Sequence, residues 1–234
     1  MLYYMDFLGL KKLHIRETLK ISESDFPRAI AFIDFANVNK WYERDTLDES
    51  GNALAHDKYL TVDLQKFANF LNLFCDDVRF YYGTDPKRIG SIKFLGAARH
   101  IFGEERVFTK DVQYIRHDLT IEEAKKAPKY IQSDAVGSFI YIPKCNFDVE
   151  ITLDAIRLMD KFTTFCLLSG DADFAPLNLY LRRHGKKIIL IKSGRIQAIL
   201  GCSVNAKINA QDIKQHISSQ KQKPGSCEPG LAES

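Results

Sequence analysis

Residues 165–174 read FCLLSGDADF. The apolar run that opens this stretch predicts a buried strand, and the Ser-Gly pair that stops the run predicts the end of that strand. Asp171 and Asp173 follow, and two residues at this spacing share one face of an extended segment. Their side chains are therefore expected in the crevice at the carboxyl end of a strand, where open α/β sheets bind ligands.

A second stretch has the same form. Residues 29–36 are apolar except for Asp34, and Asn37 follows them. A strand buried on both faces has this composition, and a carboxylate within it is costly unless it is paired or binds a metal. Two alternatives remain open. Asp34 could instead cap the next turn, and Asn37 could either position a water or phosphate or cap a turn.

The rest of the chain alternates apolar strands with segments of helical spacing. Strands are predicted at 77–82, 107–115, 139–142 and 187–191, and helices after Asp63, at 89–102, at 147–159, at 176–185 and at 195–200. This alternation predicts βαβ units and a mostly parallel central sheet. Right-handed crossovers then bring the carboxyl ends of the strands to one edge. In the helix at 147–159, spacing predicts a core face of Val149, either Ile151 or Leu153, Ile156 and Met159.

We expect three parts in the chain. Residues 29–217 form one α/β domain, which contains a polar loop at 40–60. Residues 1–28 form an N-terminal extension, either an additional helix or strand or an interaction arm. Residues 218–234 are rich in Gln, Lys, Pro, Gly and Ser, which predicts a disordered tail.

Composition excludes several classes of protein. The apolar content of 45% and the charged content of 27% are ordinary for a globular protein, and the net charge of +3 indicates no strong electrostatic bias. The sequence contains no apolar run of the roughly twenty residues that span a membrane. None of the five cysteines forms a C-x-x-C pair, which disfavours structural zinc and favours reduced thiols in a cytoplasmic protein.

A third acidic position begins the predicted helix at 147–159. Asp148 lies in its first turn, where the helix dipole favours a carboxylate whether or not it binds a ligand. Asp154 follows six positions later, roughly 240° around the helix. The two side chains therefore cannot both face one pocket, and we expect Asp148 to be the ligand and Asp154 to support it.

The aspartates at these element ends suit a hard cation, because Mg²⁺ binds oxygen ligands and retains several waters. Such an ion can activate water and stabilise charge on a phosphodiester oxygen. Ser169 could donate a hydrogen bond to a carboxylate or a phosphate.

The histidines form no zinc-binding or acyl-transfer pattern. A phosphohydrolase that uses Asp34 as a nucleophile is disfavoured, because the acid usual two residues later is Ala36.

Three segments carry a resemblance to a known family. Residues 32–37 (FIDFAN) resemble the first-strand signature of NYN domains, the LabA-like family of PIN-like nucleases. Residues 144–154 resemble the family's central helix motif. Residues 168–177 (LSGDADFAPL), together with 181–187 (LRRHGKK), are similar to its most recognisable block. The resemblance extends over about residues 29–215.

The resemblance implies a three-layer, Rossmann-like PIN-type domain that cleaves RNA endonucleolytically. It also implies Mg²⁺ or Mn²⁺ at a site whose metal ligands and catalytic residues are Asp34, Asp148, Asp171 and Asp173. Supporting roles fall to Asn37, Asp154 and Ser169. The alternative function is a non-catalytic RNA-binding or protein-interaction module that keeps the fold, and the sequence leaves a homodimer open.

Basic residues could contact a single-stranded or structured RNA. The candidates for the RNA backbone are Lys144, Arg182, Arg183, Lys186, Lys192 and Arg195. Cations are also favoured at a solvated helix end, so this simpler explanation stays open for each of them. The same two alternatives, a solvated loop or a nucleic-acid contact, apply to the patch formed by Lys125, Lys126 and Lys129.

Overall fold

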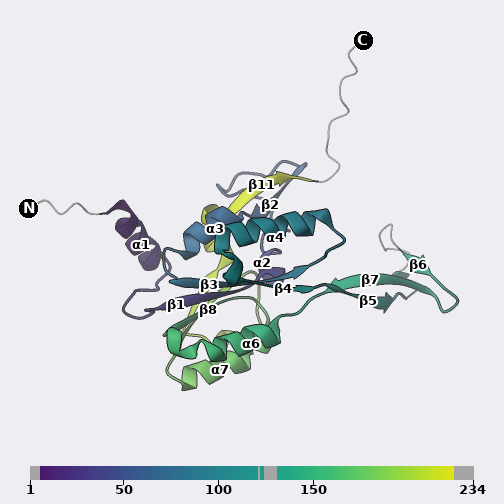
Figure 1. The fold of residues 1–234 in the computed structure, drawn as a ribbon. Helices are drawn as coiled ribbons and strands as arrows, with labels where there is room; N and C mark the ends of the chain where they lie inside the picture. Colours follow the sequence, from purple (N-terminus) through teal and green to yellow (C-terminus); the bar gives the residue numbers. More distant parts are fainter. Residues whose placement is uncertain (1–5, 121, 124–130, 224–234) are drawn as a thin grey trace, which may run out of the picture.

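The computed structural model describes residues 6–120, 122–123 and 131–223. Six parallel strands form its central sheet in the order β10-β9-β8-β1-β3-β4 (Figure 1). Their bounds are β1 Ala29–Asp34, β3 Asp77–Thr84, β4 Val107–Asp111, β8 Thr164–Leu168, β9 Lys187–Lys192 and β10 Ala206–Asn209. The predicted α/β class and parallel central sheet are confirmed.

The direction in which strands are added to the sheet reverses beside β1. The chain passes from β1 to β3 and β4 on one side, and later from β8 to β9 and β10 on the other. The carboxyl ends of the neighbouring strands β1 and β8 therefore flank the point where the crossovers diverge. Open α/β sheets bind ligands at such a switch point.

Helices cover both faces of the sheet, with α3 and α4 on one side and α6 and α7 on the other (Figure 1). Their bounds are α3 Leu64–Leu71, α4 Ile89–Phe102, α6 Asp148–Arg157 and α7 Ala175–Arg183. Side chains of β1 alternate between two apolar cores. Ala31 and Ile33 belong to the core between the sheet and helices α3 and α4, whereas Ile30 and Phe32 belong to the core between the sheet and helices α6 and α7. A strand covered on both faces needs the continuous apolar run that the sequence shows.

Local sequence signals set the ends of these helices. Asp63 caps α3, because its Oδ1 accepts a hydrogen bond from Lys66 N at 3.0 Å. Gly103 ends α4 with a φ of 94°, a conformation that favours glycine. Pro176 lies in the first turn of α7, where its missing N–H has no helical partner to lose. All three ends agree with the prediction.

Shorter elements complete the described chain. In the N-terminal extension, α1 Phe7–Thr18 packs through the buried Ile15, and Arg16 Nη2 donates to Phe74 O at 3.3 Å. The other short helices are α2 Phe35–Val38, α8 Ala198–Cys202 and α9 Lys214–Ile217. The 3₁₀ turns are η1 Glu104–Arg106, η2 Met159–Lys161, η3 Ala172–Phe174 and η4 Ala210–Ile213.

An antiparallel sheet, here called the arm, projects beyond the end of β4 (Figure 1). Its strands pair in the order β5-β7-β6, with the bounds β5 Gln113–Asp118, β7 Ser138–Lys144 and β6 Gln132–Ser133. The prediction of one strand at 107–115 is wrong, because the chain leaves the central sheet at Val112 and forms β4 and β5 separately. Lys125, Lys126 and Lys129 lie outside the described residues.

The strand predicted at 139–142 extends further than expected, because Pro143 lies inside β7 and does not end it. Leu119 N donates to Ser138 O at 2.8 Å, so these two residues form a hydrogen-bonded pair of the β5–β7 ladder. Hydrogen-bonded and non-hydrogen-bonded pairs alternate along an antiparallel ladder, and the pair of Tyr114 with Pro143 is therefore not hydrogen-bonded. The Pro143 nitrogen faces away from β5. On its other side β7 pairs with β6 only at residues 138–139. Proline is tolerated at this position because no ladder hydrogen bond is lost.

The prediction of a tail that is disordered from residue 218 onward is also wrong in part. Ser218–Gln222 form β11, which pairs with β2 Lys58–Val62 in an antiparallel sheet. The β2 strand itself lies at the end of the segment predicted as a polar loop. Backbone pairing orders these polar sequences, and composition does not reveal such pairing. Residues 224–234 lie outside the described residues.

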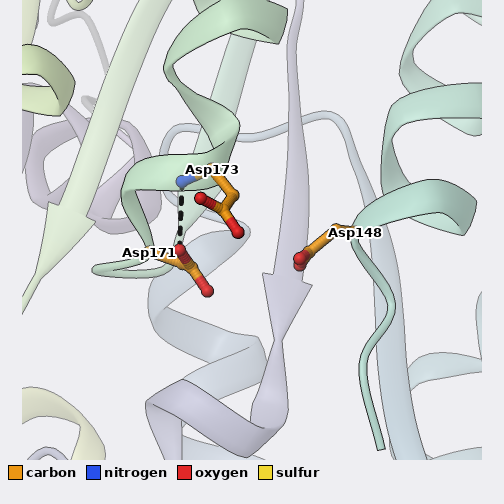
Figure 2. A group of neighbouring side chains, drawn as sticks. All are labelled: Asp148, Asp171 and Asp173. Atoms are coloured by element: carbon orange, nitrogen blue, oxygen red, sulfur yellow. Dashed lines mark hydrogen bonds between the residues drawn. The ribbon is translucent and has the colours of Figure 1, made fainter.

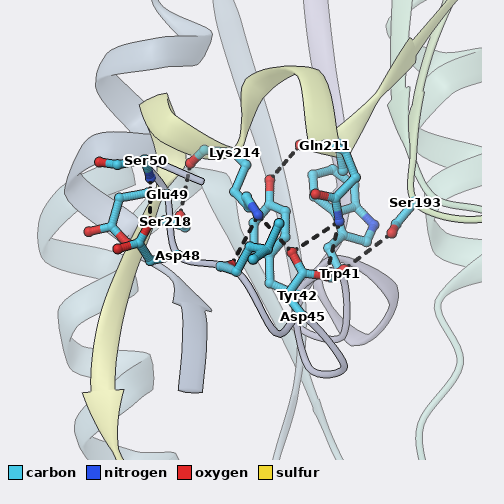
Figure 3. Close-up of polar contacts among 12 residues, drawn as sticks. Trp41, Tyr42, Asp45, Asp48, Glu49, Ser50, Ser193, Gln211, Lys214 and Ser218 are labelled. Atoms are coloured by element: carbon cyan, nitrogen blue, oxygen red, sulfur yellow. Dashed lines mark hydrogen bonds and ion pairs between the residues drawn. The ribbon is translucent and has the colours of Figure 1, made fainter. Parts of the chain in front are cut away.

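Polar contacts hold the loop after α2 against the elements that precede β11 (Figure 3). Tyr42 OH donates to Ala210 O at 2.8 Å. The Asp45 carboxylate accepts hydrogen bonds from Gln211 Nε2 at 3.1 Å and from Lys214 Nζ at 3.2 Å. The C-terminal part of the chain therefore fixes a loop that lies far from it in sequence.

Only part of the predicted core face of α6 is buried, because Ile151 faces the core and the other side of the helix faces solvent. Val149, Leu153 and Ile156 are 68%, 45% and 39% exposed, whereas Ile151 and Ala155 are fully buried. A polar contact between α6 and β3, described below, fixes this rotation of the helix. The apolar spacing alone could not distinguish the two faces.

Two further observations concern the described residues. None of their helices is long and apolar enough to cross a membrane. Cys75, Cys145, Cys166 and Cys202 are free thiols. Cys227 lies outside this part of the chain.

Main-chain bonds at the ends of β11 show which of its N–H groups face β2. Asp63 N donates to Ile217 O at 2.8 Å, and Lys223 N donates to Asp57 O at 2.7 Å. The alternation of an antiparallel ladder then directs the N–H of Ser219 toward β2.

Replacement of Ser219 by proline should therefore break the pairing of β11 with β2. We expect the free energy of unfolding to fall by at least about 1 kcal/mol, which lowers Tm by about 2–4 °C for a chain of this size. Ser219→Ala keeps the N–H and is the matched control. Thermal unfolding followed by circular dichroism gives both values, and equal Tm values for the two variants would contradict the β11 pairing.

Candidate functional site

Three carboxylates meet at the carboxyl end of the sheet. Asp148 begins α6, Asp171 directly precedes η3, and Asp173 lies within η3. One carboxylate oxygen from each lies within 4.8 Å of the others. Figure 2 shows Asp171 and Asp173 on one side of this cluster and Asp148 on the other. The sequence prediction that distant acids converge at this edge holds for these three residues.

Hydrogen bonds of the β8–η3 turn hold Asp171 in place. Its Oδ1 accepts from Asp173 N at 3.0 Å, which caps η3. Its own N–H donates to Ser169 Oγ at 3.2 Å. The Ser-Gly-Asp-Ala-Asp sequence therefore turns sharply after β8 and directs two carboxylates to the same side.

Asp34, at the end of β1, lies beside this cluster without belonging to it. Ser169 Oγ donates to Asp34 Oδ2 at 3.0 Å, so one buried hydroxyl connects Asp34 with the turn that carries Asp171. Asn37 strengthens this junction, because its Oδ1 accepts from Gly170 N at 3.1 Å. These contacts give Ser169 and Asn37 a definite place next to the carboxylates.

The environment of Asp34 disfavours its charged form. Burial raises the pKa of Asp34, and the negative charges of Asp148 and Asp171 raise it further. The hydrogen bond from Ser169 acts in the opposite direction, because it stabilises the carboxylate. A nearby cation would remove most of this penalty.

Asn146 orients Asp148 through two reciprocal hydrogen bonds. Its Nδ2 donates to Asp148 Oδ2 at 2.7 Å, and its Oδ1 accepts from Asp148 N at 2.7 Å. The sequence analysis missed Asn146, although an Asn two residues before the first acid of a helix is a signal for such a turn. Burial raises the pKa of Asp148, with further contributions from Asp171 and Asp173.

The donor set fits a hard divalent cation. All three groups are carboxylates, and oxygen is the ligand that Mg²⁺ prefers. Opposite ligands in a Mg²⁺ octahedron lie about 4.2 Å apart, since each bond is about 2.1 Å long. Oxygens within 4.8 Å of one another therefore need only small shifts to share one ion. Asp148, Asp171 and Asp173 would hold the ion, with Asp34 beside them.

Asp154 lies away from the cluster and binds β3. Its Oδ2 accepts from Arg79 Nη2 at 2.9 Å and from Tyr81 OH at 2.8 Å. Tyr81 is fully buried and packs against Phe147, the residue that precedes α6. Asp154 therefore fixes the rotation of α6, and through that rotation the direction of Asp148.

The six predicted basic residues separate into two groups. Lys144 ends β7 shortly before Asp148, Lys192 is the last residue of β9, and Arg195 follows in the next turn. The other three lie at the far end of α7, near the opposite edge of the sheet, and are Arg182, Arg183 and Lys186.

Contacts confirm the position of this second group. Lys186 Nζ donates at 2.9 Å to Phe162 O, just before β8 begins, and Arg182 Nη1 donates at 3.1 Å to Cys202 O. In a βαβ unit the helix runs antiparallel to its strands, so the C-terminal end of α7 lies at the amino edge of the sheet, away from the carboxylates.

The parallel sheet and the carboxylate cluster at its switch point define a Rossmann-like α/β protein with a candidate metal centre. The family model for the NYN domain matches residues 28–207, which is more than half of the chain. The chain belongs to the NYN domain family, a member of the PIN-like nuclease superfamily. This membership suggests a function of the nuclease type.

Comparison with solved structures supports the fold. A crystal structure of a protein of unknown function from Vibrio parahaemolyticus matches with a TM-score of 0.53 and 18% identity. The match covers 82% of this chain and 96% of that one. A search of curated proteins gave no match.

Neutralising Asp148 should stabilise the protein in the absence of metal. Its folded pKa lies above the ordinary value of 3.8, so its charge destabilises the folded state at neutral pH and has no effect once the pH is below that value. Removal of one repulsive pair of charges at this distance should raise the free energy of unfolding by about 1 kcal/mol. For a chain of this size that corresponds to a rise in Tm of about 2–4 °C.

The measurement is the Tm of Asp148→Asn and of wild type in EDTA between pH 4 and pH 7. We expect the difference to shrink toward the acid end. The exposed Asp160→Asn is the control, and it should show no such trend. A lower Tm for Asp148→Asn than for wild type at pH 7 would contradict the repulsion between these carboxylates.

Asp154→Ala should lower stability and should weaken metal binding without abolishing it. It leaves the buried Tyr81 hydroxyl without its acceptor, which costs about 1–3 kcal/mol. We expect a lower Tm and a smaller rise in Tm on addition of Mn²⁺ than in wild type, because the three carboxylates of the cluster remain but Asp148 is held less firmly. Loss of the Mn²⁺ effect in Asp154→Ala would place Asp154 in the metal site instead.

Proposed function

We propose that this protein is a metal-dependent endoribonuclease that hydrolyses RNA phosphodiester bonds. The convergence of Asp148, Asp171 and Asp173 at the switch point of a PIN-like fold supports this proposal most directly. A bound Mg²⁺ or Mn²⁺ would supply activation of water and stabilisation of negative charge on the phosphate. Asp34 adds a fourth carboxylate beside the three.

The chain's own residues prepare the site before any substrate binds. Ser169 and Asn37 tie the ends of β1 and β8 together, so the turn that carries Asp171 cannot move independently of Asp34. Asn146 restricts the side chain of Asp148. Such positioning matters because phosphoryl transfer is catalysed mainly by orientation and electrostatic stabilisation.

A polyanionic substrate also fits the charges at this edge. Lys144, Lys192 and Arg195 lie on the carboxyl-end edge with the cluster, and cationic side chains supply most of the sequence-independent affinity for a phosphate backbone. We therefore propose RNA contacts for these three residues. Arg182, Arg183 and Lys186 are not part of this proposal, because they lie near the other edge.

The test is cleavage of a labelled circular RNA with Mn²⁺, because only an endonuclease can cut a molecule without ends. We expect wild type to linearise it, EDTA to abolish cleavage, and Asp171→Asn to reduce kcat/KM by about a hundredfold or more. The variant keeps an oxygen that can accept the N–H of Asp173, so the turn should remain intact. Asp160→Asn is the active control.

Two results would contradict the proposal. Equal cleavage by wild type and Asp171→Asn would remove the carboxylates from the reaction. Wild type that binds RNA without cleaving it under any divalent metal would favour the non-catalytic binding module.

A further inference from the structure

A groove runs along the carboxyl ends of β1 and β3, on the side of the arm. It consists of two adjoining hollows of about 660 Å³ and 420 Å³. Both are lined by Phe35, Asn39, Tyr82, Gly83, Val112 and Pro143. Volumes of this size are typical of sites for small organic ligands.

The groove opens next to the carboxylates. Phe35 and Ala36 line the smaller hollow and directly follow Asp34 in sequence. Cys145 lines its other side and precedes Asn146, the residue that orients Asp148. The smaller hollow is therefore lined by residues that flank Asp34 and the Asn146–Asp148 turn at the same edge of the sheet.

Aromatic rings form one wall of the groove. Phe94 lies between Phe35 and Tyr82, with ring centroids 4.8 Å and 4.7 Å away. The Tyr82 hydroxyl is hydrogen-bonded to Ser91 Oγ at 2.9 Å, which leaves the ring in a fixed position. Tyr114 from the arm adds a further ring that is 40% exposed.

A buried carboxylate holds Tyr114 in this position. Asp85 is only 6% exposed and accepts hydrogen bonds from the Tyr114 hydroxyl, from Arg88 Nε at 3.2 Å and from Lys87 N at 3.1 Å. The hydrogen bond from Tyr114 lowers the pKa of Asp85. Asp85 therefore remains charged and joins the arm to the end of β3.

Gly83 permits the close approach that forms the groove. A Cβ atom at this position would lie 2.7 Å from the Cβ of Cys145 and 3.3 Å from the side chain of Val112. Only glycine lets both ends of the arm pack this closely on β3. The groove is therefore built jointly by the arm and the central sheet.

Charge identifies the kind of molecule that fits. Arg88 offsets the charge of Asp85, so the exposed Lys40 and Lys144 leave the lining of the groove positive next to the acidic cluster. A phosphate backbone satisfies the lysines, and a base can stack on an aromatic ring only when it is unpaired.

We propose that the groove binds one or two unpaired nucleotides adjacent to the bond that is cleaved, so that the protein selects single-stranded RNA. The bases lie against Tyr114 and the ring of Tyr82, and the phosphates lie near Lys40 and Lys144. This inference rests on the proposed function for the position of the cleaved bond, but the binding itself can be measured without cleavage.

The test is fluorescence anisotropy in EDTA with a labelled RNA of about ten nucleotides, single-stranded or annealed to its complement. We expect wild type to prefer the single strand and Tyr114→Ala to bind it about fivefold or more weakly. Tyr114→Phe keeps the ring but loses the hydrogen bond to Asp85, so it should bind more weakly than wild type and more tightly than Tyr114→Ala. Tyr180→Ala, at a tyrosine on α7 that is 39% exposed, is the matched control and should not change the affinity.

A second variant keeps the proposal testable if Tyr114→Ala does not fold. Lys40→Gln should weaken binding and reduce its dependence on salt, because one phosphate contact is lost. The exposed Lys187→Gln, at the opposite edge of the sheet, is its control. Unchanged affinity in Lys40→Gln and in any folded Tyr114→Ala would overturn the proposal, as would equal affinity of wild type for single strand and duplex.

Cleavage separates this inference from the proposed function. With Mn²⁺, Tyr114→Ala should raise KM and leave kcat close to that of wild type. If wild type never cleaves but the binding results hold, the nuclease proposal fails and the groove stands. If wild type cleaves and Tyr114→Ala has the same KM and the same affinity, the groove proposal fails and the nuclease stands.

Discussion

The candidate site depends on the Ser169 hydroxyl, which donates to Asp34 and accepts from the N–H of Asp171. Carboxylates repel one another, and burial increases the cost of holding them close together. Hydrogen bonds from Ser169 and Asn146 offset part of this cost and fix the directions of the acidic groups. The sheet supplies the remaining constraint, since β1 and β8 are direct neighbours with a parallel register.

Two further carboxylates, outside the cluster, also fix the positions of neighbouring elements through hydrogen bonds. Asp154 anchors α6 on β3 and thereby aims Asp148, and Asp85 anchors the arm on the end of β3 and thereby aims Tyr114. In both cases a carboxylate that is mostly buried is satisfied by an arginine and a tyrosine hydroxyl. The strand β3 and the turn that follows it therefore organise one side of the carboxylate cluster and one wall of the neighbouring groove.

The sequence predicted those features whose signals are local. Apolar runs predicted β1 and β8, and the predicted helix bounds agree with the start of α3 and the end of α4. Features that depend on distant partners could not be predicted this way. The strand β11 has a polar sequence and is ordered only by β2, the rotation of α6 depends on Arg79 and Tyr81, and Asn146 and Tyr114 gain their roles from neighbours in space. The sequence correctly placed Asp34 at the carboxyl edge of the sheet. Only the structure shows that Asp34 lies beside the cluster of the other three aspartates and is not part of it.

The pairing of β11 with β2 has a consequence for how the protein is made. Ser169 and Asp34 are 135 positions apart, and β11 pairs with a strand in the first third of the chain. Contacts between such distant residues form slowly, because long loops must close first. During synthesis the carboxylates cannot assemble until β8 and its following turn have left the ribosome, and the peripheral sheet closes only after residue 222. Assembly of the carboxylate cluster is therefore a late event in the folding of residues 6–223.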